Sequence, residues 1–373
     1  MIADSPGVRR AWGWVDHLRS GGTTPWSEWS GQAVAAGPVL PGAQHLEVVR
    51  RLNLLGPVPA HLTDTVLSTS GAGRGQQDLD LVGVRDGEHF GAPAVDPAHI
   101  AAEELSRVGA GALADLVLAA PAPAEQDRAS APRRRLRRHR YRLVGDPLLA
   151  GSYRDQLSAQ GRPSGGRHPR VVLLLHDYAG YLADVWSVQA RRGNGLGWGG
   201  WLDQFAGQRV LPHRVDVVAV AAQWADRVGP DRVHPAFEPH EVAAVTGGAV
   251  VTPDRLSHAA LEVARETSTA LRLSLGDEAR QARLAGVLLP WLRAVDTGTL
   301  RPPTVPERHR DWVQAEAVRI RDALADAGYP VPRGGLDRLL PDQAEPRAGV
   351  IGSPDDGEVL GMMVAALHHG AAR

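Results

Sequence analysis

The sequence contains neither lysine nor cysteine, so all 41 of its basic residues are arginine. Without lysine, the chain has no side-chain amine for a Schiff base and no lysine to place on a phosphate. Without cysteine, it has no thiolate nucleophile, no thiolate metal site and no disulfide. Whole classes of covalent and metal chemistry are therefore excluded.

Net charge and long apolar runs are lacking as well. The formal net charge is −1, so no overall field draws the chain to nucleic acid or to an anionic membrane. No apolar run approaches the ~20 residues that span a bilayer, and the N-terminus holds no apolar stretch of signal-peptide length. We therefore expect a cytoplasmic location with no nucleic-acid or membrane partner. The dominance of arginine, alanine and glycine is typical of a high-GC bacterial genome, a codon bias that also accounts for the missing lysine.

The 373 residues, of which 43% are hydrophobic, suffice for two domains or for one large domain with an extension. We expect a mainly helical module at 1–118, a linker rich in Pro, Ala and Arg at 119–140, an α/β domain at 141–340, and a second linker with a C-terminal helix at 341–373. Seven arginines lie between Arg133 and Arg142, at the end of the first linker and the start of the segment after it. The balanced total charge and the lack of interleaved aromatics favour a solvated segment over a nucleic-acid patch.

The second half of the chain alternates between strand and helix patterns. Residues 171–175, VVLLL, form an apolar run with the length of a strand that is buried on both faces. Shorter strands are expected at 141–145 and near Val233. Helices are expected at 215–228, from Thr252-Pro253 onward, at 277–295, at 307–327 and after Ser353-Pro354. This order predicts an α/β fold with a mostly parallel sheet and flanking helices.

A tryptophan motif occurs twice, at an offset of 172 residues. Both copies read W-x4-R-x-G-x4-W-x2-W, from Trp14 to Trp29 and from Trp186 to Trp201, and they hold six of the ten tryptophans. The pattern predicts a helix that ends at the glycine, a short loop, and two tryptophans on one face of the next helix. A duplication, two solutions to one packing problem, and a platform for sugar rings or bases remain alternatives, although tryptophans at helical spacing are more often core.

Residues 141–340 resemble the sulfotransferase family of P-loop proteins, in particular the sulfotransferase-like proteins of high-GC bacteria. Four stretches carry the resemblance in order, namely LVGDPLLAGS at 143–152, VVLLLHDYAGYLADVWSVQ at 171–189, LPHRVDVVAVAAQWADRVGPDRVH at 211–234 and ERHRDWVQAEAVRIRDALADAGYPV at 307–331. The resemblance implies a parallel sheet whose first strand runs into a glycine-containing loop. In the family this loop holds the 5′-phosphate of phosphoadenosyl phosphosulfate (PAPS).

The resemblance also implies nucleotide-binding residues and a ligand. Gly145, Gly151 and Ser152 would belong to the 5′-phosphate loop, Arg154 would follow it, and Ser187 would stand at the second contact of the 3′-phosphate. The implied cofactors are PAPS or adenosine 3′,5′-bisphosphate, and the implied partner is an anionic small molecule.

The positions that carry the chemistry of the family are altered. Leu148 or Leu149 stands where the family presents a lysine to the transferring sulfuryl group, and His176 replaces the strand-end arginine that pairs with the 3′-phosphate. Sulfuryl transfer needs positive charge at the developing anionic oxygens, and leucine supplies none. The arginines that could replace it, although none is in register, are Arg154, Arg191 and Arg192. The loop backbone and a helix N-terminus would still bind an anion weakly.

Asp146, His176 and Asp177 are catalytic candidates on their residue types alone. Asp146 follows the first expected strand, and His176-Asp177 follows VVLLL. If these strands are parallel neighbours, the three side chains lie at the carboxyl edge of the sheet, where α/β folds place ligands. Such a group could hold a divalent metal or act as acid and base, whereas the simpler interpretation is that the aspartates cap helices or close turns.

Three functions follow from these observations. The first is a sulfotransferase-like binding or scaffold protein with altered PAPS-binding motifs and without ordinary catalysis. The second is an active sulfotransferase that uses arginine in place of the loop lysine. The third is a metal-dependent hydrolase at Asp146, His176 and Asp177. The sequence leaves open whether the protein is an enzyme.

Overall fold

The computed structural model describes residues 5–70, 78–84, 94–121, 140–193, 196–208, 211, 215–296, 302–330, 334–341 and 354–373. Most of the first expected linker, at 122–139, lies outside these residues, and so does 342–353 of the second. The predicted run of arginines is therefore described only at Arg140 and Arg142.

The first part of the chain is helical, as its apolar periodicity predicts. Its elements are α1 (Pro6–Arg19), η1 (Trp26–Glu28), α2 (Ala43–Leu55), α3 (Ala60–Ser68), η2 (Pro97–His99) and α4 (Ala102–Ala119). Leu46, Val49 and Leu52 lie on one face of α2 and are fully buried. Burial of such side chains contributes about 1.5–3 kcal/mol each, so this stripe is what holds α2 against its neighbours.

A three-stranded parallel sheet opens the second part of the chain. The strands β1 (Tyr141–Gly145), β2 (Arg170–Leu174) and β3 (Val233–Ala236) pair in the order β1-β2-β3, with Gly145 opposite Leu174. Residues 171–174 of the central strand are at most 1% exposed, which agrees with the prediction of a strand covered on both faces. The described chain is therefore an α/β protein with a small parallel sheet and many helices.

Helices cover both faces of the sheet, and further helices pack against these. They are α5 (Pro147–Ala159), α6 (Tyr178–Arg191), α7 (Trp198–Ala206), α8 (Val217–Val228), α9 (Pro239–Thr246) and α13 (Glu307–Asp326), with short 3-10 turns at η3 (Pro230–Arg232) and η5 (Asp337–Leu339). Val171 and Leu173 face the larger core, which includes α6 and α8. Val172 and Leu174 face a smaller core built with α5 and α9. This alternation is the period of two expected of a strand.

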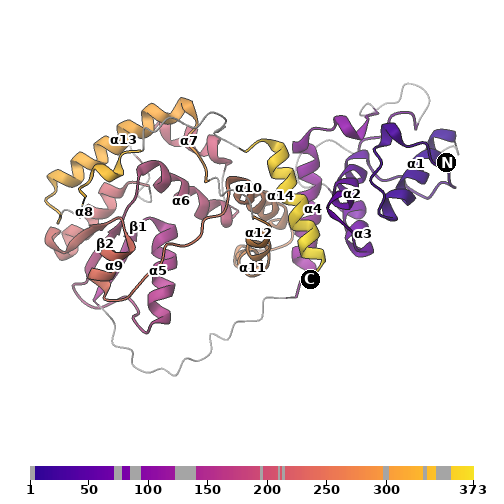
Figure 1. Cartoon of the computed structure of the whole chain (residues 1–373). Coiled ribbons are helices and arrows are strands. Elements are labelled where there is room, and N and C mark those ends of the chain that lie inside the picture. Colours follow the sequence, from indigo (N-terminus) through magenta and orange to yellow (C-terminus); the bar gives the residue numbers. More distant parts are fainter. Residues whose placement is uncertain are drawn as a thin grey trace.

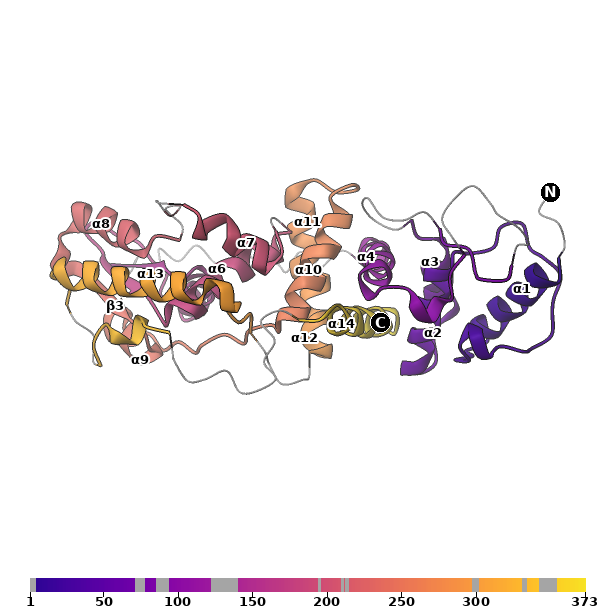
Figure 2. The ribbon, with the colours of Figure 1, turned by 90° about the horizontal axis from the view of Figure 1, so that it is seen from above.

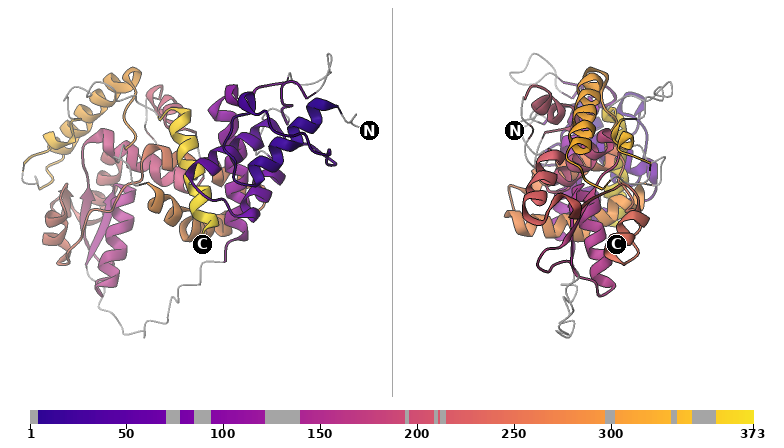
Figure 3. Two further views of the ribbon diagram at one scale, coloured as in Figure 1. Left: turned by 45° about the vertical axis from the view of Figure 1, so that its right-hand side comes forward. Right: turned by 90° about the vertical axis from the view of Figure 1, so that its left-hand side faces the viewer.

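The remaining helices join the two ends of an elongated molecule. They are α10 (His258–Leu271), α11 (Asp277–Arg283), the π-helical turn η4 (Leu284–Leu288), α12 (Leu289–Val295) and α14 (Asp356–Ala371). In Figures 1 and 2 they lie between the sheet and the N-terminal helices, and Figure 3 shows α14 along α4. Buried residues of both parts belong to one continuous core, so the expected domain boundaries stay a prediction.

The expected helix start at Thr252-Pro253 is wrong. Helix α10 begins at His258, and Ser257 is its N-cap, with the Ser257 hydroxyl accepting a hydrogen bond from the Ala260 N–H at 3.2 Å. The Thr252 hydroxyl lies 3.4 Å from the Tyr153 hydroxyl instead. The irregular segment between these residues carries Arg255 toward α6, which matters for the site described below.

The two tryptophan motifs share the first helix and its turn but differ after it. The predicted next helix is present in the second copy as α7, whereas in the first copy Trp26–Glu28 forms only the 3-10 turn η1. Helices α1 and α6 have the same bounds at the offset of 172, and each is followed by a glycine with positive φ, 87° at Gly21 and 66° at Gly193. In both copies the first indole N–H donates to the carbonyl ten residues on, and the first two indoles cross at 55° with centroids 5.5 and 5.6 Å apart. These tryptophans are buried, so their role in the fold is packing, and the second copy anchors α6, which bears part of the site.

No helix in the described part of the chain is both long and apolar enough to cross a membrane. The cytoplasmic location stays a prediction.

Candidate functional site

Asp146 lies at the junction of β1 and α5. Its N–H donates to the Leu174 carbonyl at 3.0 Å, which holds the junction against β2. One carboxylate oxygen accepts the Leu149 N–H at 2.8 Å, so Asp146 is the N-cap of α5, and Pro147 occupies the first helical position. The side chain is fully buried. The second carboxylate oxygen remains for a partner from the next strand.

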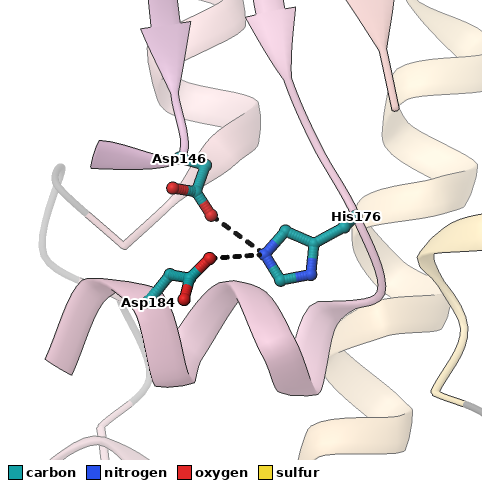
Figure 4. A group of neighbouring side chains, drawn as sticks. All are labelled: Asp146, His176 and Asp184. Atoms are coloured by element: carbon teal, nitrogen blue, oxygen red, sulfur yellow. Dashed lines mark hydrogen bonds and ion pairs between the residues drawn. The ribbon is translucent and has the colours of Figure 1, made fainter. Parts of the chain in front are cut away.

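That partner is His176, which follows β2. Its Nε2 lies 2.9 Å from Asp146 Oδ2, a contact that is marked by a dashed line in Figure 4. Its Nδ1 lies 3.4 Å from one carboxylate oxygen of Asp177. The other oxygen of Asp177 accepts a hydrogen bond from the Gly180 N–H at 2.8 Å, so Asp177 is the N-cap of α6. The structure thus brings the three predicted residues together at the carboxyl edge of the sheet, because β1 and β2 are parallel neighbours.

Two further residues complete the cluster, and the sequence prediction missed both. Asp184 of α6 places Oδ2 3.2 Å from His176 Nε2 and is 2% exposed. Arg255 donates to both carboxylate oxygens of Asp184, at 2.9 Å from Nε and 2.6 Å from its terminal nitrogen. The spacing of seven residues between Asp177 and Asp184, two helical turns, was the available signal for Asp184. No local pattern pointed to Arg255.

The ionisation of the cluster follows from these contacts. Burial alone would lower the pKa of His176, but its hydrogen bonds to Asp146, Asp177 and Asp184 outweigh burial and raise the pKa to about 11. Burial likewise opposes ionisation of Asp184, yet His176 and Arg255 lower its pKa. Burial raises the pKa of Asp146, against the pull of His176. We therefore assign His176 as an imidazolium at neutral pH.

The charges of the cluster nearly cancel. With all three carboxylates ionised, Asp146, Asp177 and Asp184 would face the two cations His176 and Arg255, which would leave one net negative charge. His176 is held between three carboxylates, and Arg255 is paired with Asp184, so both cations already have partners within the protein. Asp146, His176 and Asp184 also each offer a ligand atom, and the three atoms lie within 4.8 Å of one another, a spacing that suits a small cation. In this group Asp184 takes the place of Asp177, which the sequence hypothesis had named.

The bend after β1 is short. Only Asp146 separates the strand from α5, and Gly145 adopts a φ of 89°. A Cβ on Gly145 would lie 2.3 Å from the Leu174 carbonyl oxygen, so the glycine serves close approach of two strands. The Asp146 carboxylate already occupies the helix N-terminus where an anion would bind.

The other predicted nucleotide contacts lie apart from the cluster. Gly151 and Ser152 lie within α5, and the Ser152 hydroxyl accepts a hydrogen bond from the Gln156 amide at 3.1 Å. Arg154 is exposed on the same helix, and its charge acts on Tyr141 at the start of β1. The Ser187 hydroxyl is buried and donates to the Ala183 carbonyl at 2.7 Å. Asp184, one turn earlier, is the residue of α6 that faces His176.

No family model, no curated protein and no solved structure matches this chain.

Proposed function

We propose that the α/β part of this chain is a sulfotransferase-like scaffold that acts by binding and not by sulfuryl transfer. The observation that carries the proposal is the Asp146 carboxylate at the N-terminus of α5. The family resemblance assigns the 5′-phosphate to this helix N-terminus, and a buried carboxylate there repels a phosphate. The cations nearest to it are already paired within the cluster.

The cluster then has a structural role. It ties the end of β1, the end of β2, helix α6 and the irregular segment before α10 into one unit. Breaking a buried ion pair by removing one partner typically costs about 3–5 kcal/mol, because the other charge is left uncompensated. Such a network fixes the geometry of a binding scaffold without supplying the transition-state charge that transfer requires.

Calorimetric titration with adenosine 3′,5′-bisphosphate tests the proposal. We expect no binding at micromolar concentrations, in the wild-type chain or in Arg154→Ala. Micromolar binding that is lost in Arg154→Ala or Ser152→Ala would refute the scaffold assignment and support an active transferase that uses arginine. An Asp146→Asn variant sharpens the test, because removing the charge at the helix N-terminus should weaken the exclusion of phosphate.

A divalent cation site is the second candidate, favoured by the three convergent ligand atoms of Asp146, His176 and Asp184. A metal held there would supply an activated water for hydrolysis. It ranks second because His176 must first lose a proton: with a pKa of about 11, this costs roughly four powers of ten in apparent affinity at pH 7. Arg255 on Asp184 adds repulsion.

Titration with Mn²⁺ and with Zn²⁺ distinguishes the two candidates. A metal site predicts saturable binding that strengthens between pH 7 and 9 and disappears in Asp184→Asn. The scaffold assignment predicts no saturable binding in this range. Asp64→Asn is the matched control, because Asp64 is an exposed carboxylate on α3 with an arginine partner of its own.

A further inference from the structure

Arginines from three strands gather at the amino edge of the sheet. The strands are parallel, so the residues at their starts share one edge. Arg140 and Arg142 lie at the start of β1, Arg167 and Arg170 at the start of β2, and Arg232 directly precedes β3. The first four are exposed and Arg232 is partly exposed. These five residues, the arginine patch, lie at the edge opposite to the charged cluster.

Direct contacts join the members of the patch on β1 and β2. The Arg170 N–H donates to the Arg140 carbonyl at 2.8 Å. A Cβ on Gly166 would lie 3.1 Å from Cγ of Arg140, so the Arg140 side chain rests on the turn that carries Arg167. Arg142 lies one residue pair further along the ladder between the two strands. The patch is therefore fixed by the pairing of β1 with β2.

Arg232 joins the patch from the third strand. Its Nε donates to the Pro169 carbonyl at 3.5 Å, and a terminal nitrogen donates to the His168 carbonyl. Both acceptors belong to the turn before β2, next to Arg170. Burial lowers the pKa of His234 on β3, and the charges of Arg170 and Arg232 lower it further. The edge therefore carries a positive potential that reaches the neighbouring strand.

The arginine patch lacks the acidic partners that other arginines of the chain have. On α2, α4, α10 and α13, an arginine pairs with a glutamate three residues earlier, at 2.5 to 2.8 Å. No carboxylate of the described residues forms an ion pair with a member of the patch. Asp231, next to Arg232 in the chain, is exposed. The net charge of −1, on which the expectation of no nucleic-acid partner rests, therefore conceals a local excess of positive charge.

The chemistry of the edge favours one kind of partner. Arginine forks bind phosphate oxygens in pairs, and a nucleic-acid duplex presents about one phosphate charge per 1.7 Å of its axis. Residues 140–142, 166–170 and 231–232 expose no Phe, Tyr or Trp, so they offer no platform for unpaired bases. The large exposed apolar side chains of the described residues lie elsewhere, so none is placed to enter a membrane at this edge.

We propose that the arginine patch binds the phosphate backbone of double-stranded nucleic acid without reading its base sequence. The five further arginines at 133–138 lie outside the described residues and are not part of this site. No member of the patch belongs to the charged cluster, so the inference is independent of the scaffold assignment and of the metal candidate. Titration with adenosine 3′,5′-bisphosphate and the experiment below can fail separately.

Fluorescence anisotropy of a labelled DNA duplex of mixed sequence, titrated with the full chain, tests the patch. We expect micromolar binding at about 50 mM NaCl that weakens about 20- to 50-fold at about 150 mM, which corresponds to three or four phosphate contacts. Two duplexes of unrelated sequence should bind equally. Absence of binding at the lower salt concentration, or binding that does not depend on salt, would overturn the proposal.

Two triple variants with the same change of net charge locate the binding surface. Replacing Arg140, Arg167 and Arg170 by glutamine should weaken binding at least about tenfold and lower its salt dependence by about three contacts. The matched control replaces three exposed arginines of other elements by glutamine, namely Arg192, Arg293 and Arg310, and should bind as the wild type does. Equal binding by the two triple variants would overturn the proposal.

A single variant and three other polyanions keep the test decisive. Arg170→Gln should lower the salt dependence by about one contact, which gives an answer even where the triple variant does not fold. Single-stranded DNA of the same sequence, vesicles that contain phosphatidylserine, and polyglutamate should each bind more weakly than the duplex at equal charge concentration. Tighter binding to any of the three would overturn the assignment to double-stranded nucleic acid.

Discussion

Replacement of Asp184 by asparagine is the perturbation that tests the cluster most strongly. Asp184 is 2% exposed and accepts hydrogen bonds from Arg255 at 2.6 and 2.9 Å, with His176 at 3.2 Å. Asparagine keeps the shape and removes the charge, so both cations lose a carboxylate. Breaking a fully buried pair costs about 3–5 kcal/mol. Arg255 is one-third exposed and recovers part of its hydration, so we expect a loss of about 2–3 kcal/mol.

The assay is equilibrium unfolding in guanidinium chloride at pH 7, with Asp64→Asn as the matched control. The side chains of Arg19 and Asp64 are 50% and 67% exposed, and a surface ion pair contributes at most about 1 kcal/mol. A loss of 2–3 kcal/mol raises the unfolding constant by about 30- to 150-fold, which separates the two variants clearly. If Asp184→Asn costs no more than Asp64→Asn, the reasoning that the cluster holds the sheet edge together is refuted.

Three further predictions follow from the same structure. The pKa of His176 in the folded protein is raised from 6.5 to about 11, so the stabilisation that its charge supplies is complete below pH 6.5 and is lost as the pH rises toward 11. This loss is at most about 1.4 kcal/mol of unfolding free energy per pH unit. In unfolding measured from about pH 6.5 to about pH 9.5, His176→Gln should therefore weaken the dependence of the unfolding free energy on pH. Gly145→Ala should cost about 2–4 kcal/mol of unfolding free energy, because the φ of 89° and the Leu174 carbonyl at 2.3 Å both oppose a Cβ, and a loss below 1 kcal/mol would contradict this. Trp14→Phe and Trp186→Phe should each lower the unfolding free energy by roughly 2 kcal/mol, because each removes a buried indole and one hydrogen bond to a carbonyl. The two losses should agree within about 1 kcal/mol in thermal and chemical unfolding. Unequal losses would show that the two motifs pack differently.

Local sequence patterns were sufficient to predict the three strands and to predict that Asp146 and His176 lie close together. The run VVLLL specified a strand buried on both faces, and parallel pairing then placed the residues after β1 and β2 at one edge. Asp146 and His176 meet for that reason alone. Asp146 and Asp177 also cap helices, which is the simpler of the two interpretations that the sequence offered. The two aspartates therefore cap helices and belong to the cluster at the same time.

The rest of the site depends on tertiary structure that no local pattern encodes. Arg255 reaches Asp184 because the segment before α10 is irregular, whereas Thr252-Pro253 carries a good helix-start signal. Ser187 lies on α6 as expected, but its hydroxyl bonds to the helix backbone and Asp184 faces the site. The phase of a helix relative to a site is set by how the helix packs, and here the second tryptophan motif sets it.

The protonation state of His176 is the most direct test of the account, because the claim that the sheet edge is filled by the protein's own charges depends on it. Nitrogen-15 NMR of histidine-labelled protein at pH 8, with His176→Gln to assign the signal among the 15 histidines, reads this state directly. The account predicts that both ring nitrogens of His176 carry protons at pH 8. A neutral ring with one bare nitrogen would contradict it and would leave that nitrogen free for a metal.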